Sequence, residues 1–88
     1  MVLKKKNTVS LFNIFPNPTT GYIWLQAAGR MENAVFNVYN AEGKKVLEQN
    51  INNSVAGTTI NMSHLAAGVY TIVIKTASTS EIHKIIKQ

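Results

Sequence analysis

The histidines and acidic residues are the side chains of this chain whose types could carry acid–base or metal chemistry. The sequence holds two histidines, four acidic residues and no cysteine. His64 and His83 fall in different predicted elements, and the acidic residues are glutamates spread along the chain. A zinc site needs three or four converging ligands, and calcium loops rely on aspartate, which is missing. The sequence therefore predicts no metal site and no cofactor.

The hydroxyl residues and glycines lack the surroundings that catalysis requires. No serine shares a motif with a histidine and an acid, and no glycine-rich loop is spaced to hold a phosphate. We therefore predict that the chain is not an enzyme.

Aromatic residues leave one binding chemistry open. Tyr22, Trp24, Tyr39 and Tyr70 stand in segments with strand-like alternation. Such residues can form a face that stacks on sugars, although aromatic residues in strands more often pack in a core or in cross-strand pairs. An adhesive or carbohydrate-binding module is therefore the alternative function.

The positive charge is concentrated near the start of the chain. The formal net charge is +5, but Lys4, Lys5 and Lys6 supply three of the nine basic residues. The remaining basic residues are scattered rather than arranged in a stripe with interleaved aromatics, so nucleic-acid binding is not expected. No apolar run approaches the ~18 residues of a membrane span, so stable membrane insertion is not expected either.

Length and composition favour one folded domain. A chain of 88 residues with 45% hydrophobic residues suffices for a single core. The lack of cysteine excludes a disulfide scaffold but fixes no compartment. The start, Met1–Leu3 followed by lysines, lacks the basic-then-apolar order of a secretory signal, so an exported protein would need an upstream part.

The most rigid stretch is a corner at residues 15–21, Phe-Pro-Asn-Pro-Thr-Thr-Gly. Pro16 and Pro18 fix their own φ angles and disfavour helix in the residues before them. Gly21 is expected to use its freedom to adopt positive φ. The corner therefore predicts a turn between two strands.

Short alternating segments separated by turn residues predict strands throughout the chain. The expected strands are residues 9–15, 22–27, 34–40, 44–51, 58–62, 69–76 and 81–87. Both faces of 22–27 are apolar enough to be covered, and 69–76 has the composition of a strand in the middle of a sheet. The expected inward side chains include Ala34, Phe36, Val38, Tyr70, Ile72 and Ile74.

Two further turns join these strands. Residues 40–43 predict a hairpin turn with positive φ at Gly43. Residues 63–68 predict one helical turn, begun by Ser63 and closed by Gly68, with Leu65 at the edge of the core. At Gly21, Gly43 and Gly68 an added side chain should strain the backbone.

Seven strands with no helix longer than a turn indicate an all-β fold, a seven-stranded antiparallel immunoglobulin-like β-sandwich. The paired cysteines of antibody domains are absent. The architecture does not depend on them, because unrelated modules share it.

Four motifs in order along residues 11–88 carry a family resemblance. They are residues 16–21 (Pro-Asn-Pro-Thr-Thr-Gly), 38–44 (Val-Tyr-Asn-Ala-Glu-Gly-Lys), 65–70 (Leu-Ala-Ala-Gly-Val-Tyr) and 84–87 (Lys-Ile-Ile-Lys). Together they resemble the C-terminal sorting domain of the type IX (Por) secretion system of Gram-negative bacteria. The motif residues that carry the resemblance are Pro16, Asn17, Pro18, Gly21, Gly43, Lys44, Gly68 and Tyr70.

The resemblance implies a domain fused behind a cargo protein and recognised by the type IX secretion machinery, comprising an outer-membrane translocon, a shuttle and a sortase-like peptidase that removes the domain. It implies export through the periplasm to the cell surface or medium. The sorting domain is expected at residues 9–88, with residues 1–8 as a linker or vector-derived start.

Three lysines are candidates for recognition. Lys75, Lys84 and Lys87 each interrupt an apolar strand and are expected to point to solvent. Recognition by strand addition at a sheet edge and recognition by side-chain contact both stay open at this point.

Overall fold

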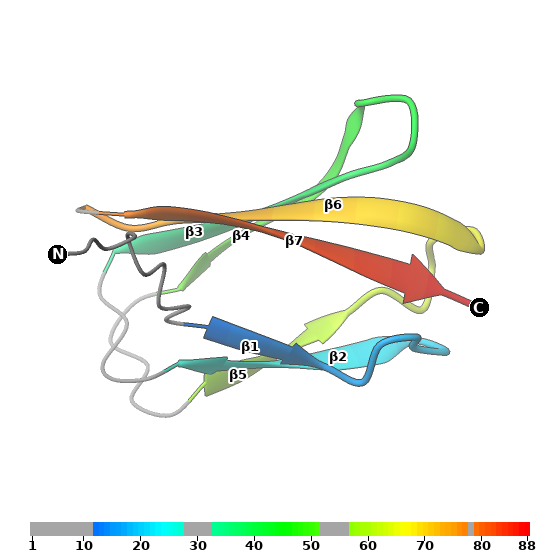
Figure 1. Ribbon diagram of the computed structural model, residues 1–88, viewed down its shortest axis with the longest axis horizontal. Coiled ribbons are helices and arrows are strands. Elements are labelled where there is room, and N and C mark those ends of the chain that lie inside the picture. Colours follow the sequence, from blue (N-terminus) through cyan, green and yellow to red (C-terminus); the bar gives the residue numbers. More distant parts are fainter. Residues whose placement is uncertain (1–11, 28–32, 52–56, 78) are drawn as a thin grey trace, which may run out of the picture.

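The computed structural model describes residues 12–27, 33–51, 57–77 and 79–88. In these segments the chain forms seven strands in two antiparallel sheets, which Figure 1 shows as two stacked layers. The predicted seven-stranded antiparallel sandwich is therefore confirmed. The strands are Phe12–Phe15 (β1), Tyr22–Ala27 (β2), Ala34–Tyr39 (β3), Lys45–Ile51 (β4), Gly57–Asn61 (β5), Gly68–Lys75 (β6) and Ser80–Lys87 (β7).

The smaller sheet has three strands in the order β1-β2-β5. Ile23 and Leu25 of β2 point inward and are buried, as the alternation of β2 predicts. The expectation that the opposite face of β2 is also covered is wrong, because Tyr22 is 59% exposed. The other sheet lies against one face only (Figure 1).

The larger sheet has four strands in the order β4-β3-β6-β7. Strand β6 pairs with β3 on one side and with β7 along its whole length on the other. Its predicted place in the middle of a sheet is therefore confirmed. On the outer face Asn37 is nevertheless buried, and its Oδ1 has no hydrogen-bond partner among the described residues.

Strand β4 forms one edge of this sheet and carries charge there. The Lys45 ammonium donates to Glu48 Oε1 at 2.9 Å. This hydrogen bond and the carboxylate's negative charge raise the pKa of Lys45. The pair is exposed, so it contributes little to stability, but charged side chains on an edge strand discourage pairing with other chains.

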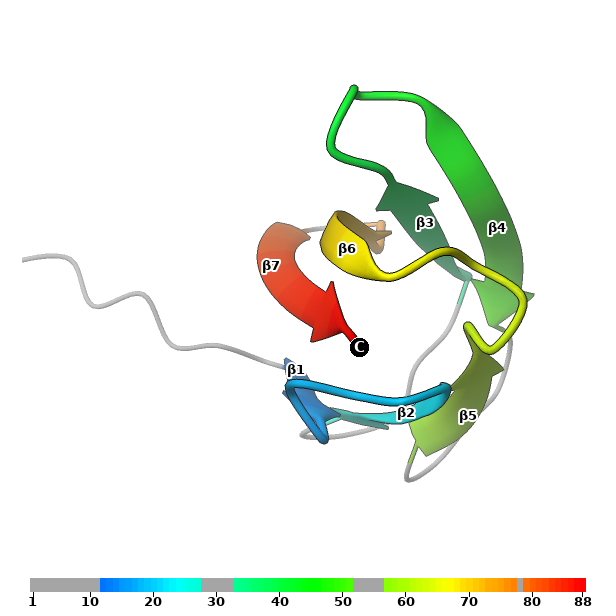
Figure 2. The ribbon, with the colours of Figure 1, turned by 90° about the vertical axis from the view of Figure 1, so that its right-hand side faces the viewer.

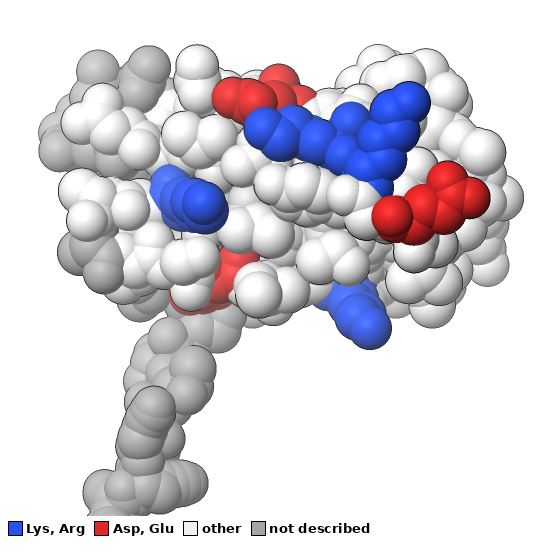
Figure 3. Space-filling view, turned by 90° about the horizontal axis from the view of Figure 1, so that it is seen from above, with Lys and Arg blue, Asp and Glu red and all other residues white. Residues whose placement is uncertain are grey.

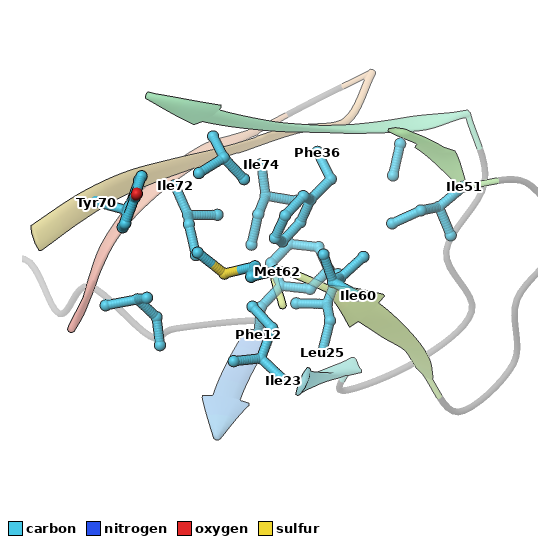
Figure 4. Packing of buried hydrophobic residues seen from close by; sticks show 13 residues of the cluster. Phe12, Ile23, Leu25, Phe36, Ile51, Ile60, Met62, Tyr70, Ile72 and Ile74 are labelled. Carbon is cyan, nitrogen blue, oxygen red and sulfur yellow. The ribbon is translucent and has the colours of Figure 1, made fainter. Parts of the chain in front are cut away.

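The core lies between the two sheets and takes side chains from both. Figure 4 shows Met62, which follows β5, reaching toward residues of both layers. Leu65 packs against the edge of this cluster, as expected. Each large aliphatic side chain buried here contributes about 1.5–3 kcal/mol of transfer free energy. The buried hydrophobic residues are Phe12, Ile23, Leu25, Ala34, Phe36, Val38, Ile51, Ile60, Met62, Tyr70, Ile72, Ile74 and Ile85.

The element boundaries differ from the sequence-based ones at several places. Strand β5 begins one residue earlier than predicted, at Gly57. Residues 63–67 form a non-helical turn, so the predicted helical turn is wrong. Residues 9–11 of the first predicted strand and the loop at 52–56 lie outside the described residues. None of the described segments is a helix of the length and apolarity that crossing a membrane requires.

Candidate functional site

The four sequence motifs meet at one end of the sandwich. The loop between β1 and β2, the β3–β4 turn, the turn before β6 and the last residues of β7 all lie at the right-hand end of Figure 1 and face the viewer in Figure 2. The strand registers agree, because Gly68 pairs with Lys87 and Thr19 forms a bridge with Lys87. We call this region, residues 16–21, 40–44, 63–70 and 84–88, the motif end.

Asn17 ties the proline corner to the last strand. Its side-chain Nδ2 donates to the Lys84 carbonyl at 3.0 Å, and its Oδ1 accepts from the Ile86 N–H at 3.0 Å. The amide thus occupies the place that the peptide group of a neighbouring strand would take along β7. The Phe15–Pro16 and Asn17–Pro18 peptide bonds that flank Asn17 are both cis.

Thr19 continues this attachment with its backbone. Its N–H donates to the Ile86 carbonyl at 2.9 Å, and its carbonyl accepts from the Gln88 N–H at 2.8 Å. Its buried hydroxyl donates to the Tyr22 carbonyl at 2.7 Å and accepts from the Gly21 N–H at 3.1 Å. The corner of the smaller sheet therefore closes the edge of the larger one from Lys84 to Gln88.

The β3–β4 turn is fixed by Asn40 and Gly43. Gly43 has φ of 85° and donates its N–H to the Asn40 carbonyl at 2.9 Å, so its predicted positive φ is confirmed. The Asn40 Oδ1 accepts from the N–H groups of Glu42 and Lys44 at 2.9 and 3.0 Å. An asparagine that opens a turn commonly satisfies backbone donors in this way.

The turn before β6 stands beside this hairpin. The Leu65 N–H donates to the Met62 carbonyl at 3.0 Å, and the Tyr70 hydroxyl donates to the Ala66 carbonyl at 2.5 Å. The ring of Tyr70 therefore packs in the core, while its hydroxyl stabilises the turn through a hydrogen bond. Residues 40–42 and 66–70 together line a shallow depression of about 230 Å³.

Comparison with known proteins assigns the family. Residues 13–88 match the sequence profile described as the secretion system C-terminal sorting domain. The chain belongs to this family. The resemblance to the type IX sorting domain is thereby confirmed, and the family is one of sorting signals rather than enzymes. Membership makes the chain a C-terminal signal of a secreted protein, which implies a fused cargo and contact with the type IX machinery.

A solved structure supports the fold of this sorting domain. The crystal structure of a DUF3244-family protein with an immunoglobulin-like β-sandwich fold, from Bacteroides vulgatus, superposes with a TM-score of 0.76 at 20% identity. The alignment covers 89% of this chain and 85% of that protein. The predicted immunoglobulin-like class is therefore confirmed. No curated protein matches in sequence.

The three lysines singled out in the sequence do not form one patch on the sorting domain. Lys75 is exposed but pairs with Ser80, at the opposite end of the sheet from the motif end. Lys84 is exposed. Lys87 is only 8% exposed, so the expectation that it points to solvent is wrong. Figure 3 shows basic and acidic side chains interspersed on the outer face of the larger sheet.

Lys87 is buried because of the residues around it. It shares the inward side of β7 with the core residue Ile85, at the point where the buried Thr19 of the corner forms its bridge with β7. The aliphatic stem packs there, while Nζ donates to the Gln88 carbonyl at 3.3 Å. Lysine often buries its stem and keeps its charged end near polar groups.

Gly21 has a different role from the one predicted. It is not among the residues with positive φ, so the expected left-handed conformation is wrong. A Cβ added there would lie 3.3 Å from the Ser63 Cβ, which indicates that close packing of two turns selects glycine.

Gly68 has φ of 157° and open space around it. Thr19, which sequence reasoning did not single out, could have been noticed only from its place within the 16–21 motif.

The residues considered for acid–base chemistry stay apart. His64 is exposed in the turn before β6, whereas His83 contacts Glu81 on β7 at 2.9 Å. In the described segments no three histidine or carboxylate side chains are grouped as metal ligands would be. The four aromatic residues do not form one face either: Tyr70 is in the core, Tyr39 is on the larger sheet, and Tyr22 and Trp24 share the smaller one.

Proposed function

We propose that the type IX secretion machinery recognises this sorting domain at its motif end and that the domain directs a fused cargo through this apparatus across the outer membrane. The route runs through the periplasm to the cell surface or medium, and a sortase-like peptidase then removes the domain. The observation that carries the proposal is the gathering of the four motifs at one end of the sandwich. Residues 9–88 are the signal, and residues 1–8 are a linker or a vector-derived start.

The position of the cargo supports this proposal. Strand β1 begins at Phe12, which pairs with Ala27 at the end of the sandwich opposite the corner. A cargo joined to the N-terminal side therefore enters the domain far from the motif end (Figure 1). The point of attachment therefore does not itself cover the motif end.

The contacts of the corner favour recognition by exposed turns over strand addition at the end of β7. Asn17 and Thr19 already occupy the outward backbone groups of β7 at Lys84, Ile86 and Gln88. A partner strand would have to displace these hydrogen bonds before it paired there. Exposed groups of the neighbouring turns, including Lys44 and His64, are available without any such displacement.

A fusion experiment tests the proposal. The 88-residue chain is joined to the C-terminus of a passenger that carries its own signal peptide, in a host with the type IX apparatus. We expect the passenger at the cell surface or in the medium, shortened by loss of the domain. The same residues placed ahead of the passenger should leave it in the periplasm. Equal export from both positions, or export from neither, contradicts the proposal.

A further inference from the structure

The outer face of the smaller sheet carries three aromatic side chains that neither the core nor the motif end uses. Phe15 and Trp24 are direct neighbours across β1 and β2, and Tyr22 stands two residues before Trp24 on the same face. Phe15 is 47% and Tyr22 59% exposed, and Trp24 is half-buried. Neighbouring positions on such a face are about 5–7 Å apart, so the three rings share one surface. We call these three residues the aromatic face.

The indole of Trp24 is fixed on this surface. Its Nε1 donates to Gln26 Oε1 at 2.8 Å. A Cβ added to Gly57 on β5 would lie 2.8 Å from Trp24 Cζ2, so the ring reaches over the glycine. The indole therefore lies across the neighbouring strand and cannot turn away without losing its hydrogen bond. A ring held in this way has less rotational freedom to lose when a ligand binds.

The three strands that carry the aromatic face are polar but uncharged. Strands β1, β2 and β5 contain no lysine, arginine, aspartate, glutamate or histidine. Asn13 and Thr59 are exposed on the same face and make no side-chain hydrogen bond to the described residues. Amides and hydroxyls supply both donors and acceptors. The face thus combines apolar ring surfaces with neutral hydrogen-bonding groups.

This chemistry matches a pyranose sugar, which has flat C–H surfaces and a rim of hydroxyl groups. Specific sites for such molecules place aromatic surfaces beside a few polar groups. Charged ligands such as nucleic acids and anionic lipids would find no countercharge in these strands. We propose that the aromatic face binds a neutral polysaccharide, with successive sugar rings stacked on Tyr22, Trp24 and Phe15. Phe15 and Tyr22 flank residues 16–21, but the aromatic face is the outer surface of the smaller sheet and is proposed as a site separate from the one used in sorting.

Affinity electrophoresis of the 88-residue chain tests the proposal. Native gels run toward the cathode contain a soluble β-glucan, xylan or mannan, or polygalacturonate as an anionic polymer. We expect at least one neutral polysaccharide to retard the chain. The net charge of +5 favours some retardation by polygalacturonate, which the aromatic variants should leave unchanged. The proposal is wrong if no neutral polysaccharide retards the chain.

Two variants and a matched control locate the binding. Tyr22→Ala removes an exposed ring and should weaken neutral polysaccharide binding about tenfold with an unchanged melting temperature. Trp24→Ala should weaken binding at least as much, but it uncovers Gly57, so its melting temperature is measured alongside. Ile82→Ala removes a 69% exposed apolar side chain from the larger sheet and should bind normally.

Two results overturn the assignment of the face. Polysaccharide binding that Tyr22→Ala leaves unchanged would place the site elsewhere. Loss of passenger export in Tyr22→Ala, with no retardation of the unaltered chain by any neutral polysaccharide, would make the face a contact for the secretion machinery instead.

Discussion

At the scale of single residues, the glycines of this domain are selected by two different physical demands. Gly43 has φ of 85° with nothing within 4 Å of an added Cβ, so only its backbone conformation favours glycine. At Gly57 an added Cβ would overlap the Leu25 carbonyl oxygen and approach the Trp24 ring. A backbone atom in the middle of a paired strand cannot move aside as the end of a flexible side chain can.

We therefore expect Gly57→Ala to destabilise the domain more than Gly43→Ala. The expected loss is about 3 kcal/mol or more at Gly57 and about 1 kcal/mol at Gly43. Gly43→Asn should cost less than Gly43→Ala, because asparagine tolerates left-handed backbone. Urea unfolding of the three variants measures these differences. Equal losses at Gly57 and Gly43 would show that the contact with Leu25 relaxes freely.

Sequence reasoning identified Gly43 but not Gly57, and the reason is physical. The positive φ at Gly43 is required by the Asn-Ala-Glu-Gly turn, whose four residues are adjacent in the sequence, so the sequence alone predicts it. The lack of space for a side chain at Gly57 is caused by Leu25 and Trp24, which lie on another strand. Likewise, the burial of Lys87 depends on the corner at Thr19, which lies far from it in the sequence and forms a bridge with it in the fold.

At the scale of elements, alternation predicted most of the strands well because each sheet buries one face. The inward residues of β3 and β6 follow period two over their whole length, so their core positions were predicted correctly. The attachment of the corner to β7 could not be predicted. It joins Asn17 to Lys84 and Ile86, which lie 67 and 69 residues further along the chain, and involves mainly backbone groups, which leave no pattern in the side chains.

The lysines of β6 and β7 provide a prediction at this scale. Lys87→Gln shortens a buried stem and should cost about 1 kcal/mol, whereas Lys87→Met keeps a similar stem and should cost less. Replacing the exposed Lys75 and Lys84 together by glutamine should change stability by less than about 0.5 kcal/mol. Thermal unfolding of the variants checks this order.

Export of a fused passenger by the same variants then separates recognition from folding. We expect the Lys75 and Lys84 double variant to melt normally but to lose export through Lys84 alone, because Lys84 lies in the motif end and Lys75 lies at the opposite end of the sheet. Lys75→Gln alone should therefore export normally. Normal export of the double variant would place recognition on other residues, and a Lys87→Met variant as unstable as Lys87→Gln would contradict the packing role of the stem.

At the scale of the whole molecule, the sandwich has two ends with different roles. The chain enters the described structure at Phe12 at one end, and the four motifs meet at the other. The core is continuous between the ends, so a change at either end lowers the same global stability. If export depends only on whether the domain is folded, equally destabilising variants at the two ends should reduce export equally. If the machinery recognises the motif end, variants at that end should reduce export more.

Two variants of similar stability distinguish these possibilities. Asn17→Ala removes two exposed hydrogen bonds to β7 at the motif end and should cost about 1 kcal/mol. Ile51→Val removes one methylene from the buried partner of Ala34 at the other end and should cost about 0.5–1.5 kcal/mol. Export of a fused passenger should fall strongly for Asn17→Ala and stay near normal for Ile51→Val, after melting temperatures establish that the two are matched. Because Asn17→Asp keeps the acceptor for the Ile86 N–H but loses the donor to Lys84, it should export at an intermediate level. An equal fall for Asn17→Ala and Ile51→Val would mean that the machinery senses the folded state of the domain rather than its motif end.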